Sequence, residues 1–155
     1  MKRFFAILLA GMLLLSACSS GEGVEPHEFW MRSGLKDGNS AAYMILHNHT
    51  NQDADLIGAS SDVATAVEIH LSSMGADGTM QMAQQESVAI PAGEELELKP
   101  GSYHIMFIGL TRDLNVGDEV TLTLHFDGYE DVTLTVPVKD AADMDGSGMD
   151  GHNMP

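Results

Sequence analysis

The segment around His104 and Met106 places an imidazole and a thioether two residues apart. In an extended strand, residues two apart point to the same side, so both side chains would face one site. Imidazole is a good ligand for copper, and the soft thioether sulfur favours Cu(I). The spacing therefore predicts one half of a Cu(I) site, built on a β-strand.

Two further ligands of the same kinds lie upstream, in residues 65–83, whose pattern predicts a β-hairpin. A turn centred on Ala76 would make paired residue numbers sum to 152 and would place His70 directly opposite Met82. Cross-strand partners have Cβ atoms about 4.5–5.5 Å apart, which is within reach of a common metal. Met80 shares a face with Met82 and is its rival, because a small change of register would favour a diagonal partner.

The N-terminus has the layout of a bacterial lipoprotein signal over residues 1–17. Lys2 and Arg3 form a basic start, an apolar stretch follows, and small residues precede Cys18. The apolar run is shorter than the roughly 20 residues that a membrane-spanning helix needs. An ordinary secretion signal is the alternative, but it requires no cysteine at the cleavage point. We expect Cys18 to be lipidated and the protein to lie outside the cytoplasm, in the periplasm or on the outer face of the cytoplasmic membrane.

Cys18 is the only cysteine in the chain. If it is acylated, the mature domain has no thiol, which excludes disulfides, thiolate zinc sites and CxxC redox chemistry. A blue-copper electron-transfer site is excluded for the same reason, since it needs a cysteine thiolate. In an oxidising compartment, thioether ligands would also outlast thiols.

The chain is strongly acidic, with a formal net charge of −16, which becomes −18 once Lys2 and Arg3 are removed with the signal. Binding the phosphate backbone needs positive charge, so nucleic acid is excluded as a partner. The acidity suits a domain that attracts cations or basic surfaces, although it could serve solubility alone. We see no nucleophile–base set and no paired catalytic carboxylates, and expect no enzymatic activity.

The remaining sequence divides into a tether, one domain and a tail. Residues 18–26 are expected to form a flexible tether, residues 27–139 the folded domain, and residues 140–155 a disordered tail. The domain contains about eight short alternating segments with regular turn signals, which is typical of an all-β sandwich or barrel. Residues 60–66 could form a single helical turn or a loop.

Several other histidines and methionines could bind metal. The pair His47 and His49 could hold Cu(II) or zinc, His27 lies near the tether, and His125 is expected to face solvent. The tail is either a solvated end or a mobile second copper site, with Cu(II) as a candidate ion. Its potential ligands are Met144, Met149, His152 and Met154.

The sequence resembles the PCuAC family of periplasmic copper chaperones, whose motif is H/M-x10-M-x21-H-x-M. The resemblance covers residues 27–138. It rests on the segments Trp30-Met31-Arg32, Ala41-Ala42-Tyr43, Leu56-Ile57-Gly58-Ala59-Ser60-Ser61, Val67-Glu68-Ile69-His70, Ile90-Pro91-Ala92-Gly93 and Pro100-Gly101-Ser102-Tyr103-His104-Ile105-Met106. The motif assigns the metal ligands to His70, Met82, His104 and Met106.

Two positions depart from the family pattern. The first gap is x11 rather than x10, and the extra residue falls in or near the turn at residues 73–79, where insertions are tolerated. The x21 gap matches only with Met82, which favours it over Met80. The family usually has two glycines before the tyrosine, and here Ser102 replaces the second.

The resemblance implies a cupredoxin-like Greek-key β-sandwich that binds Cu(I) and hands it toward the CuA centre of cytochrome c oxidase. The partner would be an oxidase subunit or another copper chaperone, and we expect a monomer. A second hypothesis is a copper-sequestering lipoprotein for metal homeostasis or tolerance. A third is an interaction β-sandwich whose His and Met are incidental.

Overall fold

The structure, a computed structural model, describes residues 23–140 and confirms the all-β prediction. Its ten strands are β1 (Val24–Arg32), β2 (Ser40–Asn48), β3 (Ala54–Ser60), β4 (Ala64–Met74), β5 (Met80–Gln85), β6 (Val88–Ile90), β7 (Glu95–Leu98), β8 (Tyr103–Leu110), β9 (Glu119–Asp127) and β10 (Val132–Lys139). No helix in this part of the chain is long and apolar enough to cross a membrane. The predicted signal, Cys18 and the tail ligands Met144, Met149, His152 and Met154 lie outside the described residues.

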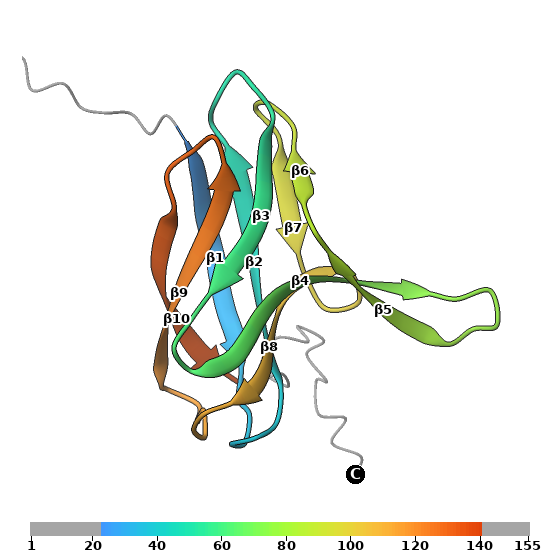
Figure 1. The fold of residues 1–155 in the computed structure, drawn as a ribbon, viewed down its shortest axis with the longest axis vertical. Helices are drawn as coiled ribbons and strands as arrows, with labels where there is room; N and C mark the ends of the chain where they lie inside the picture. Colours follow the sequence, from blue (N-terminus) through green and yellow to red (C-terminus); the bar gives the residue numbers. More distant parts are fainter. Residues whose placement is uncertain (1–22, 141–155) are drawn as a thin grey trace, which may run out of the picture.

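The strands form two halves of a cupredoxin-like sandwich (Figure 1). One half has the order β5-β4-β8-β2-β1, and β7 joins β2 alongside β8; the other has the order β10-β9-β3-β6. A short parallel pairing of β1 with β10, at Met31 with Val138 and Arg32 with Lys139, connects the halves. Apolar and polar residues alternate along these strands, so each half of the sandwich has one apolar face. The two halves pack with these apolar faces together, which removes them from water.

The core lies between the two halves and backs the strands that carry the predicted ligands. Ile105 and Phe107 of β8 are fully buried in it, and so are Leu122 and Leu124 of β9 from the other half. Because side chains alternate along a strand, His104 lies on the face of β8 opposite Ile105. The predicted site therefore lies on the outer face of a strand whose inner face is packed.

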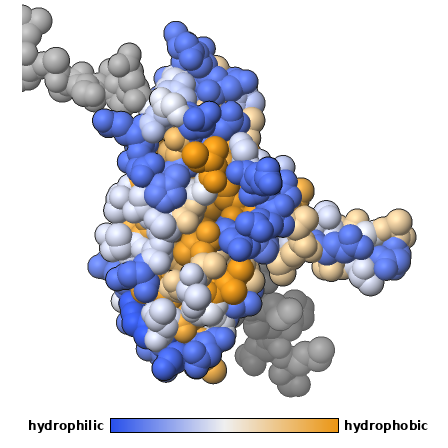
Figure 2. Space-filling model, in the orientation of Figure 1, coloured by the Kyte–Doolittle hydropathy of each residue, from blue (hydrophilic) through white to orange (hydrophobic). Residues whose placement is uncertain are grey.

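The hairpin of β4 and β5 projects from the side of the sandwich (Figure 1). β5 is an edge strand that pairs only with β4, and its residues Met80–Gln85 are exposed or half-buried. Figure 2 shows pale orange surface along this projection, beside blue polar residues. In the same view, an orange apolar band runs down the middle of the sandwich, with blue and white surface on either side.

One expected boundary needs correction, and one open alternative is decided. Residues 24–26, assigned to the tether, belong to β1, because Val24 is buried and pairs with Asn48. Of the two alternatives for residues 60–66, the loop is confirmed: residues 61–63 form a short non-helical connection between β3 and β4.

Candidate metal centre

The two predicted histidines are cross-strand neighbours. His70 on β4 pairs directly with His104 on β8, and their ring centres are 5.9 Å apart. Two imidazoles bound to one metal through nitrogens about 2.0 Å away place their ring centres roughly 5–6 Å apart. The backbone register therefore holds both rings at a separation suited to a shared ion.

Met106 joins the histidines through the same pairing of strands. It lies two residues from His104 on β8, on the same face, and pairs across to Glu68 on β4. Met106 is half-buried, whereas His104 is only 4% exposed. The prediction that His104 and Met106 lie on one strand and share a face is confirmed.

The predicted pairing of His70 with Met82 is wrong. Paired numbers in this hairpin sum to 154, so His70 lies opposite Gln84 and Met82 lies opposite Ser72. The cause is a three-residue loop: the Gly75 N–H donates to Thr79 O, and Gly78 has a φ of +80°, where glycine is favoured. Because the shift is by two residues, Met82 stays on the face of His70 as its diagonal neighbour.

Met82 nevertheless reaches the site. An open hollow of about 360 Å³ is lined by Met82, His104 and Met106, together with Tyr43 and Arg32. Met80 does not line this hollow; it lies one pair further out, opposite Met74. The geometry thus favours Met82 over Met80 as the fourth ligand, through a hollow that the sequence could not reveal.

The hydrogen bonds of His104 leave one ring nitrogen with a free lone pair. His104 Nδ1 lies 3.0 Å from the carbonyl oxygen of Ser102. A carbonyl only accepts, so Nδ1–H is the donor and Nε2 of the neutral ring keeps the lone pair. A metal ligand held by its second nitrogen in this way has a fixed tautomer and orientation.

His70 shows the complementary arrangement, held by a carboxylate. Its Nε2 lies 2.8 Å from Glu68 Oε2, and an ionised carboxylate can only accept, so Nε2–H donates. Its Nδ1 is buried and has no hydrogen-bond partner in residues 23–140. An unsatisfied buried acceptor costs about 1–3 kcal/mol, and a bound metal ion would satisfy it.

The four side chains suit a soft metal ion. Two imidazoles and two thioethers are uncharged, and the orphaned Nδ1 of His70 marks where an ion would bind. Within the described residues, no three His, Cys, Asp or Glu side chains converge on a metal position.

Sequence reasoning did not assign roles to two neighbours of the site. Glu68 was visible as part of Glu68-x-His70, where alternation places both side chains on one face, yet it was given no function. Tyr43 stands 6.4 Å from His104 between ring centres, and Trp30 packs on Tyr43 at 4.7 Å. Tyr43 lies on β2 and His104 on β8, strands that are distant in sequence, so no local pattern could have identified this contact.

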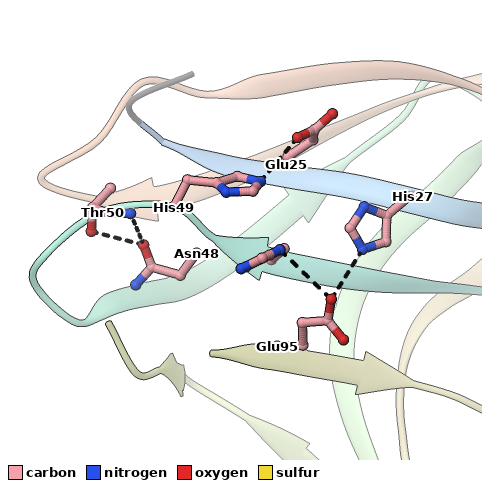
Figure 3. A network of polar contacts seen from close by, with 7 residues as sticks. Glu25, His27, Asn48, His49, Thr50 and Glu95 are labelled. Atoms are coloured by element: carbon pink, nitrogen blue, oxygen red, sulfur yellow. Dashed lines mark hydrogen bonds and ion pairs between the residues drawn. The ribbon is translucent and has the colours of Figure 1, made fainter. Parts of the chain in front are cut away.

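The other histidines lie away from the site and form polar networks. Figure 3 shows Glu95 between two imidazoles: its Oε1 lies 3.6 Å from both His27 Nε2 and His47 Nδ1. His49 pairs with Glu25 at 3.0 Å and stacks on His47 with 3.9 Å between ring centres. A metal role for His47 and His49 remains a prediction.

His125 lies on β9, in the other half of the sandwich. It is half-buried and contacts Ser60 and Asp131, each at 2.9 Å. These contacts occupy both ring nitrogens, so His125 serves as a control position for metal binding.

Comparisons with known proteins agree with this fold. A family model described as "Putative lipoprotein LpqE-like" matches residues 24–138. A lipoprotein of Leifsonia xyli subsp. xyli, Lxx21020, is 35% identical over 121 residues, 77% of this chain and 71% of the relative.

Two solved structures are PCuAC-type neighbours. The copper-bound PCuAC domain of PmoF2 is 22% identical with a TM-score of 0.64, covering 77% of this chain and 94% of that domain. The Cu(I) form of DR1885 from Deinococcus radiodurans is 26% identical with a TM-score of 0.58, covering 79% and 84%. They support the resemblance to PCuAC proteins, and the family match shows that this chain belongs to the LpqE-like lipoprotein family.

Proposed function

We propose that this protein is an extracytoplasmic Cu(I) chaperone, with His70, Met82, His104 and Met106 as its ligands. The observation that carries the proposal is the pair of oriented imidazoles. Glu68 and Ser102 each engage one nitrogen of a ring, and the remaining nitrogen of His70 is buried without a partner. Copper is the cargo of such a protein rather than a resident cofactor.

The ligand chemistry supports transfer of the ion. In their metal-binding forms all four ligands are uncharged, so copper can pass to the neutral ligands of a partner without a change of charge in the ligand set. The open hollow beside Met82 and Met106 gives a partner's ligands access to the ion. Transfer would proceed by exchange of one neutral ligand for another, with copper remaining Cu(I).

The client, the anchor and the compartment complete the proposal. Copper is delivered toward the CuA centre of cytochrome c oxidase, directly to a subunit or through another copper chaperone. Lipidated Cys18 holds the protein at a membrane outside the cytoplasm, in line with the lipoprotein description of its family. The protein acts as a monomer and carries copper without catalysing a reaction.

A deletion strain tests delivery. We expect loss of cytochrome c oxidase activity, restored by added copper or by the intact gene. A gene carrying His104→Ala should not restore activity, whereas the matched control His125→Ala should. Copper sensitivity with normal oxidase activity would instead support the alternative, a copper-sequestering lipoprotein.

A further inference from the structure

The projecting hairpin carries an unusual concentration of exposed methionine. Met74, Met80 and Met82 are 66%, 55% and 60% exposed. They make up half of the six exposed large hydrophobic residues in residues 23–140. Methionine normally fills cores, but these three side chains fill none, so packing does not account for them.

The register places these thioethers on one face. Met74 lies directly opposite Met80, and the next pair inward on the same face is Ser72 with Met82. The following pair contains His70, which is the cross-strand neighbour of His104. The sulfur-bearing side chains therefore follow the hairpin from its outer end to the proposed centre.

The opposite face of the outer hairpin differs in chemistry. Ser73 pairs with Gln81 there, and neither side chain is a soft-metal ligand. The methionines thus occupy one side only, the side continuous with His70.

We propose that Met74 and Met80 form a second, weaker Cu(I) site, an outer port that exchanges copper with the main centre through Met82. Directly opposed residues have Cβ atoms about 4.5–5.5 Å apart, so both flexible thioethers can reach one ion. Thioether sulfur selects Cu(I) over harder ions. The inference rests on the proposed function, since copper must be the cargo. During exchange, each new Cu–S bond forms as another breaks, and copper remains Cu(I).

Site-resolved NMR of the purified protein with ¹³C-methyl methionine, titrated anaerobically with Cu(I), tests the port. We expect the first equivalent to shift the Met82 and Met106 methyl signals and the second to shift Met74 and Met80. If Met82 and Met106 respond but Met74 and Met80 do not, the port is wrong and the main centre stands. If none of the four responds, the proposed function itself fails.

Two variants sharpen the test. Met74→Leu with Met80→Leu should abolish binding of the second equivalent and leave the affinity for the first unchanged. Met80→Gln with Gln81→Met keeps the composition but moves one sulfur to the other face, and should have the same effect. A second equivalent that persists in both variants, with shifts at Met144, Met149 or Met154 instead, would overturn the port in favour of the tail.

Discussion

His70 and His104 lie opposite each other on β4 and β8, with ring centres 5.9 Å apart and planes inclined by 58°. Each ring donates one N–H to a fixed acceptor, Glu68 Oε2 for His70 and the Ser102 carbonyl for His104. Both rings are thereby oriented before any ion arrives. Preorganisation of this kind reduces the ordering entropy that binding would otherwise require.

His104→Ala should lower Cu(I) affinity by more than about 100-fold, because even residues that merely orient ligands contribute 10–100-fold. Competition with a Cu(I) chelator under anaerobic conditions measures the change. His125→Ala, on the opposite half of the sandwich, should leave affinity unaltered. Equal affinities for the His104 variant and the parent protein would refute the ligand assignment.

Glu68→Gln should weaken Cu(I) binding by about 10–100-fold without removing a ligand. The carboxylate that fixes the His70 tautomer is lost, and an amide can offer either its oxygen or its NH₂ group. Imidazole ¹⁵N shifts should show protonated Nε2 at His70 in the parent protein and a mixture of tautomers in the variant. An unmixed tautomer with unchanged affinity would show that Glu68 does not position the ring.

Asn48→Ala should destabilise the fold by about 2–4 kcal/mol, since it removes several hydrogen bonds of a fully buried residue at once. The Asn48 amide donates to the Ile90 and Gln52 carbonyls, and its oxygen accepts from the Thr50 N–H. Denaturant unfolding measures the loss. As a control, Asn51→Ala changes an exposed residue in the loop that follows β2, and it should alter stability by no more than about 0.5 kcal/mol.

The hairpin turn should loosen in acid because of Asp77. The Thr79 hydroxyl and N–H both donate to Asp77 Oδ1, and these hydrogen bonds hold the pKa of the carboxyl below its ordinary value. A lowered folded-state pKa contributes stability that is present above the ordinary value of about 3.9 and is lost as pH falls through the folded-state pKa. A lower protection factor of the Thr79 amide, which is its exchange rate compared with the intrinsic rate at the same pH, should report the loss. Asp77→Asn, which can still accept but cannot titrate, should lack this response.

The sequence predicted the strands well because alternation and turn residues are local signals. A hairpin was expected over residues 65–83 and a strand around His104 and Met106, and β4, β5 and β8 lie at these positions. The face shared by His104 and Met106 also followed from alternation alone. What these residues bind stays a prediction.

The hairpin register was missed because it depends on the type of loop. A loop of residues 76–78, closed by Gly78 in the left-handed region, moves every pairing by two positions relative to a turn centred on Ala76. The sequence Gly75-Ala76-Asp77-Gly78 fits both loops. Likewise, the neighbours Tyr43 and Trp30 come from β2 and β1, and only the order of strands brings them to the site.

The four proposed ligands differ in how firmly the fold holds them. His104 lies on a strand backed by the core, whereas Met82 lies on an edge strand that is exposed along most of its length. Segments with few buried contacts open at lower free energy than core strands. We therefore expect Met82 to be the ligand that detaches first. Fraying of the β4–β5 hairpin, rather than unfolding of the sandwich, would then set the residence time of the ion.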